Sequence, residues 1–553
     1  MKTSRRFGSL LLLGLLVGCG AASPEPEVPI VPPPVSQPKV AKTPPPVVLT
    51  TPDAPFRQKA PAADGSVTFV PPKIETLKLK NGLRVLFVER RDLPIVSVRV
   101  VIKGGAGDYD FKPGVASFMG SMLEQGAGKR SALEISDEYE AIGAQHGAGV
   151  DWDSAYVAVK VMSEHLERAL DLLADVTLRP TFPEAEIERQ KERRLGNLVQ
   201  ERRSAGAMAG NAVSATVFGR KHPYGHALVG REEDVKAVKK GALEGAYRTL
   251  FNAKHATLVV AGDVAKDDVT AKLEKAFGGW KPTAGAAPKA PATPKLSEKE
   301  SRLVLVDLPK ATQTQVLLAQ PGAPFGSPDR EVISVLNAIL GGTFGSRINL
   351  NLREDKGITY GARSRFGLYR GAGSFTAGGA MAAKDGGGLA AATTVAIREL
   401  FAEVQKMRDV EVSDDELKNA KEQMKLAMPG RFETVSEVTS ALEDLAVYDL
   451  PADDFGKRVA RIEAVTAKDI KRVATDLLRP KAMKVVVVGD KAKLEADLDK
   501  LHLGPMDVRD ATGEPVKADA PKKEEPSAAP SKTDTKPSAP KAGAPKKEPA
   551  LKK

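Results

Sequence analysis

The order of apolar and polar residues predicts strands that alternate with helices. Strand-like runs lie on either side of Asn81-Gly82, a strong signal for a hairpin turn. The predicted strands cover residues 74–79, 83–89 and 97–103. Apolar residues spaced by three and four predict helices at 114–124, 133–142, 165–173 and 184–203. Irregular alternation of this kind is typical of a layered α+β domain with helices on one face of a sheet.

Two parts of the chain resemble each other. Residues 237–263 align without gaps with residues 464–490, at an offset of 227 residues. In both copies an amphipathic helix leads into an apolar strand that ends in Gly-Asp. Two copies of one α+β unit are the simplest interpretation.

Proline-rich segments divide the 553 residues into two globular stretches and their flanks. We expect an N-terminal domain at 70–282 and a C-terminal domain at 296–505, joined by a Pro/Ala/Lys linker at 283–295. Residues 19–69 are rich in proline and predict an extended spacer. Residues 506–553 are rich in Lys, Ala and Pro and lack aromatic residues, which predicts a disordered tail.

The N-terminus has the pattern of a secretory signal peptide over residues 1–18, with basic residues before a short apolar run. The only cysteine, Cys19, follows Leu16-Val17-Gly18, which resembles a bacterial lipobox. We expect cleavage before Cys19 and diacylglycerol on its sulfur; the alternative is an ordinary signal peptide with a chance cysteine. The expected location is the cell envelope, lipid-anchored. Because Gly20 is not an aspartate retention signal, the outer membrane facing the periplasm is favoured.

The charge pattern does not favour nucleic acid as a partner. The chain has 82 basic and 71 acidic residues and a formal net charge of +11. These charges are interspersed through the globular stretches, and no basic stripe with interleaved aromatic residues occurs. A solvated surface with a basic tail is the preferred interpretation.

Several motifs occur in an order that points to a family. They are Leu83–Val88, Val96–Lys103, Gly104–Asp108, His222–Gly225, Leu340–Arg347 and Leu352–Tyr360. In this order and spacing the chain resembles the M16 (insulinase/pitrilysin-like) peptidases, over nearly all of residues 70–505. The resemblance implies two homologous α+β sandwich domains of the M16/LuxS-like metallohydrolase type in tandem.

The resemblance also locates the family's zinc motif, which is degenerate in this chain. Active members carry His-x-x-Glu-His on the first helix of the N-terminal half, where positions i, i+3 and i+4 share one face. Two imidazoles then bind zinc and the glutamate activates a water. The matching residues here are Ser117, Gly120 and Ser121. Serine is a poor zinc ligand and glycine supplies no base.

The third zinc ligand of the family is a glutamate about 75 residues further along the chain. That spacing leads to Asn197, with a shift to Glu192 or Glu201 left open. In this alignment all three ligands and the base are missing. The prediction is that this chain holds no zinc of its own, and that zinc belongs to an active partner subunit.

Other candidate residues do not replace the motif. His222 and His226 are separated by Pro223 and Gly225, which favours a turn with a structural role over a metal site. His146 and His165 are single histidines without a carboxylate cluster at ligand spacing, which favours core or surface roles.

The C-terminal signature of the family is intact. The resemblance implies that Arg353 and Tyr360 contact substrate backbone, since a guanidinium donates to peptide carbonyls and a phenol adds one hydrogen bond. The alternative is a surface ion pair of Arg353 with Glu354 or Asp355, beside a packed tyrosine.

Taken together, these features predict the non-catalytic, substrate-binding subunit of a heteromeric zinc metallopeptidase. Its expected partners are a catalytic M16 subunit, peptide substrates and the membrane through the N-terminal lipid. One alternative is a pseudoenzyme scaffold that binds peptides or proteins in the envelope. The other is an active metallopeptidase with a rearranged site.

Overall fold

The computed structural model describes residues 69–295, 298, 302–383 and 387–516. The predicted signal peptide, Cys19 and the spacer up to residue 68 lie outside these residues, as does the tail from residue 517. Within the described part of the chain, no helix has both the length and the apolar character that crossing a membrane requires.

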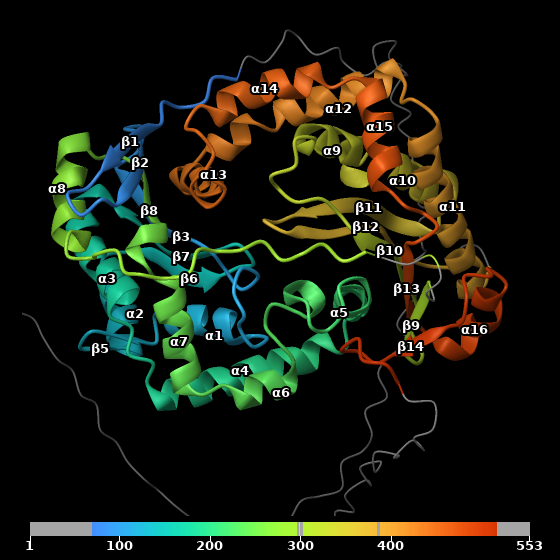
Figure 1. The fold of residues 1–553 in the computed structure, drawn as a ribbon, viewed down its shortest axis with the longest axis horizontal. Helices are drawn as coiled ribbons and strands as arrows, with labels where there is room; N and C mark the ends of the chain where they lie inside the picture. Colours follow the sequence, from blue (N-terminus) through green and yellow to red (C-terminus); the bar gives the residue numbers. More distant parts are fainter. Residues whose placement is uncertain (1–68, 296–297, 299–301, 384–386, 517–553) are drawn as a thin grey trace, which may run out of the picture. The chain divides into compact units, whose positions relative to one another are not determined.

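The first half of the described chain is built on a six-stranded sheet with strand order β1-β2-β8-β3-β7-β6 (Figure 1). Only the β2–β8 pair is parallel in this sheet. The predicted hairpin joins β1 to β2, and Gly82 takes the φ of +95° that glycine adopts without strain. The elements are β1 (Glu75–Lys78), β2 (Arg84–Glu89), β3 (Ile95–Lys103), α1 (Val115–Met122), β4 (Gly126–Ala127), β5 (Arg130–Ser131), α2 (Ala132–Ala141), β6 (Gln145–Val150), β7 (Ser154–Met162), α3 (Leu166–Leu178), α4 (Glu184–Glu201), α5 (Ala205–Val217), α6 (Glu232–Ala237), α7 (Lys240–Leu250), β8 (Ala256–Gly262) and α8 (Lys266–Phe277).

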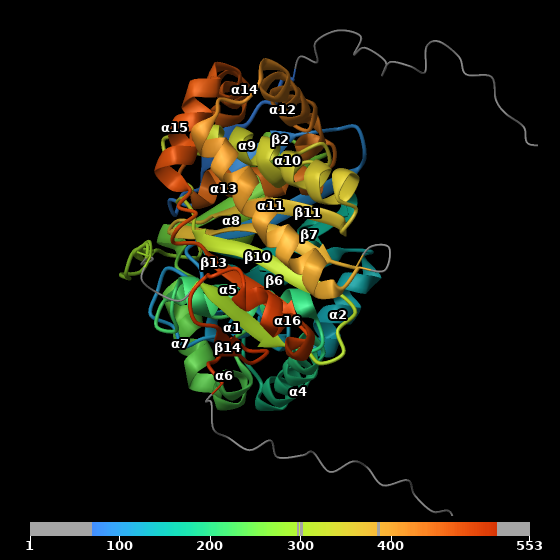
Figure 2. The ribbon, with the colours of Figure 1, turned by 90° about the vertical axis from the view of Figure 1, so that its right-hand side faces the viewer.

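The second half repeats this plan with strand order β11-β12-β10-β13-β9-β14. Strand β9 pairs in parallel with β13 and β14, and the other pairs are antiparallel. Figure 2 shows α11 lying across this sheet. The elements are β9 (Leu303–Asp307), β10 (Thr314–Pro321), α9 (Arg330–Asn337), α10 (Arg347–Asn349), β11 (Thr359–Leu368), β12 (Ala372–Met381), α11 (Leu389–Asp409), α12 (Asp414–Leu426), α13 (Val435–Val447), α14 (Asp454–Ala464), α15 (Ala467–Leu477), β13 (Lys484–Gly489), α16 (Lys491–Asp499) and β14 (Asp507–Arg509), with π-helical segments η5 (Ala338–Gly342) and η6 (Leu350–Asp355).

The structure confirms the predicted internal repeat. Helix α7 and helix α15 begin and end at residues that differ by the predicted offset of 227. Each helix leads into a fully buried strand, β8 in the first half and β13 in the second. The two halves therefore share one α+β unit, and the predicted fold class is confirmed.

Each half contributes one helix to the core of the other. Helix α13 of the second half packs on β3 and β8 of the first sheet, where Leu442 contacts a cluster that includes Val259. Helix α5 of the first half packs on β10 and β13, where Ala212 joins a cluster with Val486. The prediction of helices on only one sheet face was therefore incomplete, because the second face of each sheet is covered by the exchanged helix.

A buried polar cluster also joins the two halves. The Nε of Arg370 donates to Asp108 Oδ1 over 2.8 Å, and its backbone N–H donates to Asp153 Oδ2 over 2.6 Å. The hydroxyl of Tyr448 donates to the same Asp153 oxygen over 2.7 Å. The side chain of Asp108 is fully buried. Arg370 of the second half thus pairs its guanidinium with the buried carboxylate of Asp108 and its backbone N–H with that of Asp153, both from the first half.

The second half extends past its predicted end at residue 505. Strand β14 adds to the edge of the sheet beside β9, and the turn after it brings Glu514 to Arg220 at 2.9 Å and to Arg231 at 3.0 Å. The start of the predicted disordered tail at residue 506 is therefore wrong. Residues 507–516 fold because β9 offers a free edge and two arginines of the first half offer charge partners.

Candidate functional site

Helix α1 places Ser117 and Ser121 on one face, but their hydroxyl hydrogens are already used. The Oγ of Ser117 donates to the carbonyl of Leu228 over 2.8 Å, and the Oγ of Ser121 donates to the carbonyl of Phe118 over 2.8 Å. Ser117 is buried, and Ser121 is partly buried. Both side chains therefore act as local structural hydrogen-bond groups.

Arg194 of α4 fills the face where a metal would have to sit. Its Nη2 donates to Ser121 Oγ over 3.0 Å and to the carbonyl of Ser117 over 2.7 Å, and its Nη1 lies 3.2 Å from Ser117 Oγ. The guanidinium carbon lies 4.7 Å from the centre of the Phe118 ring. Burial, with a smaller effect of neighbouring Arg193, lowers the pKa of Arg194 to about 10. A fixed cation, tied to both serines, thus occupies the space between the two former ligand positions.

Gly120 leaves no room for a general base. An added Cβ at Gly120 would lie 2.8 Å from the backbone nitrogen of Val150 and 2.9 Å from the carbonyl carbon of Gly149. Both contacts are with backbone of β6, which cannot rotate away as a side chain can. Helix α1 is packed against the sheet at a distance that only glycine permits.

The third predicted position is not the residue that reaches α1. Asn197 is exposed and forms no described hydrogen bond to α1, and the same is true of the alternatives Glu192 and Glu201. The α4 side chain that contacts both serines is Arg194, one helical turn earlier. In the described residues no three His, Cys, Asp or Glu side chains form a group suited to hold a metal ion. The residues at this face of α1 therefore do not fit zinc.

His146 and Glu124 form a pair close to α1 that the sequence did not predict. The Nδ1 of His146 lies 2.8 Å from Glu124 Oε1, and the imidazole stacks on Tyr139 at 4.1 Å between ring centres. The hydrogen bond to Glu124 raises the pKa of His146 above its usual value, against the opposing effect of burial. The pair lies at the start of edge strand β6, and it supplies a single carboxylate.

This pair predicts a pH-dependent contribution to stability. Because the folded-state pKa of His146 is raised, its stabilising effect is full below the ordinary histidine pKa near 6.5 and is lost as pH rises through the folded-state value. We expect His146→Gln to lower the free energy of unfolding by less than about 1 kcal/mol at pH 6 and by less still at pH 9. Urea unfolding of both proteins at the two pH values measures this, and a deficit that grows at pH 9 would contradict it.

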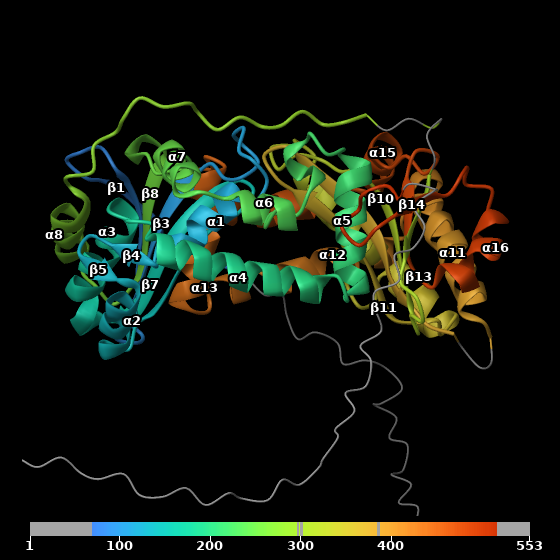
Figure 3. The ribbon, with the colours of Figure 1, turned by 90° about the horizontal axis from the view of Figure 1, so that it is seen from below.

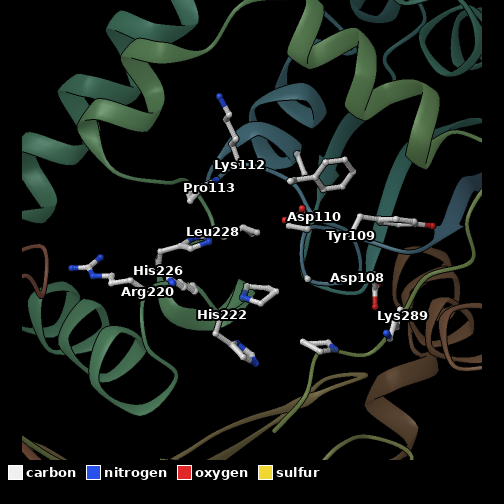
Figure 4. Close-up of a pocket in the computed structure, with 18 of the residues that line it drawn as sticks. Asp108, Tyr109, Asp110, Lys112, Pro113, Arg220, His222, His226, Leu228 and Lys289 are labelled. Atoms are coloured by element: carbon white, nitrogen blue, oxygen red, sulfur yellow. The ribbon is translucent and has the colours of Figure 1, made fainter. Parts of the chain in front are cut away.

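A cavity of about 890 Å³ opens beside the first turn of α1. Figure 4 shows His222 and His226 on its wall together with Lys112 and Arg220. The Nδ1 of His222 accepts from the N–H of Tyr224 at 3.0 Å, and its Nε2 lies 2.9 Å from the carbonyl of Ala292.

Both histidines of this wall stay uncharged more readily than free histidine, since burial lowers the pKa of His222 and of His226. Both ring nitrogens of His222 are engaged by backbone, and the Nδ1 of His226 lies 2.9 Å from the carbonyl of Ala227. These contacts give the two histidines structural roles. His165, at the start of α3, faces solvent beside Glu164.

Arg353 and Tyr360 lie together at the surface of the second half. The guanidinium carbon of Arg353 lies 5.1 Å from the Tyr360 ring centre and 4.6 Å from that of Phe344. Its Nε also pairs with Glu354 at 3.2 Å. Tyr360 is 89% exposed, so it is not the packed tyrosine of the alternative interpretation, although the ion pair of that interpretation is present. The guanidinium of Arg353 is thus in cation–π contact with two exposed aromatic rings.

The sequence was compared with known families and proteins. Residues 84–229 match the family described as "Insulinase (Peptidase family M16)", and residues 237–424 match "Peptidase M16 inactive domain". An uncharacterized zinc protease of Bacillus subtilis is 27% identical over 359 residues, which cover 64% of this chain and 83% of the relative. A probable mitochondrial-processing peptidase subunit beta of Arabidopsis thaliana is 25% identical over 433 residues, 76% of this chain and 78% of the relative.

Solved structures share the fold. A crystal structure of a peptidase M16 inactive domain from Pseudomonas fluorescens has a TM-score of 0.67 at 24% identity, and covers 75% of this chain and 98% of that one. The crystal structure of a protease from Helicobacter pylori has a TM-score of 0.68 at 20% identity, and the match covers 76% of this chain and 99% of that one.

Proposed function

Because this chain belongs to the insulinase family of M16 peptidases, we propose that it is the non-catalytic, substrate-binding subunit of a heteromeric zinc metallopeptidase. The observation that carries the proposal is the guanidinium of Arg194, hydrogen-bonded to Ser117 and Ser121 where the family's histidines would bind zinc. A positive charge at this point repels a divalent cation, and neither hydroxyl is an adequate ligand. Zinc and the activated water then come from a partner subunit with the complete motif.

The second half supports a role in holding substrate. Contacts of the Arg353 guanidinium with Phe344 and Tyr360 restrict its orientation, which favours presentation of its planar donors to a peptide. The exposed hydroxyl of Tyr360 adds a further oriented hydrogen bond. Members of this family form heteromeric assemblies, as the name of the Arabidopsis relative, a subunit beta, indicates. The proposed partners are a catalytic M16 subunit and extended peptides, with no nucleic acid involved.

The proposed location is the cell envelope. Lipidation of Cys19 would anchor the chain to a membrane surface, and several acyl chains on one residue give a stable anchor where one chain does not. The outer membrane facing the periplasm remains the favoured site. The pair of subunits would then act on peptides in the periplasm.

Capture in mild detergent tests the partnership. We expect an M16 protein with the complete His-x-x-Glu-His motif to co-purify with this chain, and the pair to cleave peptides that this chain alone leaves intact. In the reconstituted pair, Arg353→Ala should raise KM severalfold with a smaller change in kcat, while Arg398→Ala on the outer helix α11 should leave both unchanged.

Two results would redirect the proposal. Peptide cleavage that Arg353→Ala leaves untouched would favour a scaffold that binds proteins without presenting substrate, in which the Arg353–Glu354 pair is merely a surface ion pair. Chelator-sensitive cleavage by the purified chain alone would refute the non-catalytic role.

A further inference from the structure

Strand β11 carries two exposed arginines that have no described ion-pair partner. Arg363 and Arg365 are separated by one residue, Ser364, which is buried, so both arginines project from the same face of the strand. Several other arginines of this half have an ion-pair partner, such as Arg347 with Glu416 at 2.6 Å. Among the residues that the structure describes, no carboxylate forms an ion pair with Arg363 or Arg365. Two adjacent cations are thus left to solvent.

The neighbouring strand leaves these guanidinium groups uncovered. Across the ladder, Arg363 faces Gly378 and Arg365 faces Thr376 of β12. Gly378 has a φ of +149°, and a Cβ there would lie 2.0 Å from the carbonyl oxygen of Val316. Position 378 is therefore restricted to glycine, so no side chain at this position can cover Arg363.

The same end of the sheet exposes apolar surface. β11 is an edge strand, and Tyr360 near its start is 89% exposed. Phe344, on the other side of the Arg353 guanidinium, is 59% exposed. Strand β11 thus carries an exposed aromatic ring as well as the two arginines, a combination typical of surfaces that bind a ligand with both apolar and anionic groups.

We propose that the β11 face binds an extended acidic peptide, with carboxylates at alternate positions paired to Arg363 and Arg365. In an extended peptide, side chains at i and i+2 lie on one side about 7 Å apart, which is the spacing of alternate residues on β11 itself. Guanidinium groups bind carboxylates in a planar, two-pronged geometry. The inference rests on the proposed substrate-binding function and adds a substrate class: segments with acidic residues two positions apart.

Fluorescence anisotropy with the purified full chain in mild detergent tests this. The probes are a labelled decapeptide with glutamate at alternate positions, the same peptide with glutamine, and the same peptide with lysine. At low salt we expect the glutamate peptide to bind about tenfold more tightly than the glutamine peptide, and the lysine peptide most weakly. The advantage should shrink as salt rises.

Substitutions on β11 test whether Arg363 and Arg365 cause the preference for the glutamate peptide. Arg363→Gln with Arg365→Gln should abolish the preference for glutamate while leaving the glutamine peptide's affinity within twofold. The matched control is Arg398→Gln with Lys418→Gln, which removes the same charge from exposed positions of α11 and α12 that form no ion pair within the described part of the chain. Because all four side chains are exposed, both double variants should keep the unfolding midpoint of the unmodified chain.

The outcomes separate this inference from the proposed function. Equal binding of the glutamate and glutamine peptides would overturn the acidic preference and leave the substrate-binding role standing. Binding of none of the peptides would count against both. A loss of preference in the control variant, or equally tight binding of a single-stranded oligonucleotide that depends on Arg363 and Arg365, would contradict a peptide site on β11.

Discussion

Replacement of Arg370 by alanine should lower the free energy of unfolding by about 3–5 kcal/mol, because it leaves the buried carboxylate of Asp108 without its cation. Arg370 bonds to Asp108 over 2.8 Å and its backbone bonds to Asp153 over 2.6 Å. The side chain of Asp108 is fully buried in the folded chain, so its charge is not stabilised by bulk water. Urea unfolding, followed by circular dichroism, measures the change.

The pH dependence of this variant gives a second check. Burial above all, with the charge of Asp153, raises the pKa of Asp108 to about 7 even with Arg370 present. The folded chain therefore keeps a proton that the unfolded chain loses near pH 4, and its stability falls as pH rises between about 4 and 7. The loss in free energy of unfolding caused by Arg370→Ala should therefore be larger at pH 8 than at pH 5. Arg398→Ala, at an exposed position, should change stability by less than about 0.5 kcal/mol. If Arg370→Ala lowered the free energy of unfolding by as little as this control, the result would contradict a stabilising buried pair of Arg370 and Asp108.

Gly120→Ala should destabilise the chain by about 1–3 kcal/mol, although alanine is normally the better helix residue by about 1 kcal/mol. The reversal of sign follows from the backbone of β6, which lies 2.8 Å from the position of the new methyl group. Thermal unfolding measures the effect.

Gly196 in α4 is the matched control, since nothing lies within 4 Å of its added Cβ. Gly196→Ala should raise stability by up to about 1 kcal/mol. Equal gains from both substitutions would show that α1 is free to move from the sheet. If α1 is fixed as described, grafting the family's motif onto Ser117, Gly120 and Ser121 should yield a destabilised protein that still does not bind zinc, with Arg194 in place.

The repeat and the strands β1, β2, β3, β8 and β13 could be predicted because they depend on local patterns. Residues 237–263 and 464–490 carry the same apolar spacing, and the structure gives them the same helix and strand. The exchange of α5 and α13 between the two halves (Figure 3) could not be predicted, because the sequence of an amphipathic helix does not specify which sheet the helix will cover. The position of β14 was missed for a related reason: its three residues gain stability only from the free edge of β9.

The candidate site was predicted in part. Ser117 and Ser121 could be placed on one helix face from their spacing alone. Arg194 was missed, because α4 is rich in charged residues and its sequence does not distinguish the one arginine that turns inward. Counting residues from a remote motif led instead to Asn197, one turn away on the same helix. The pairing of His146 with Glu124 depends on β6 lying beside α1, a contact between elements that only the fold brings together.

Metal analysis of the purified full chain tests the central claim most directly. After incubation with micromolar zinc and dialysis, the chain should retain far less than one zinc per molecule, and Ser117→Ala should not change that value. It should also cleave no peptide in the absence of a partner. One zinc held per chain and lost in Ser117→Ala would contradict the account, because it would mean that the cation of Arg194 yields its place to a metal.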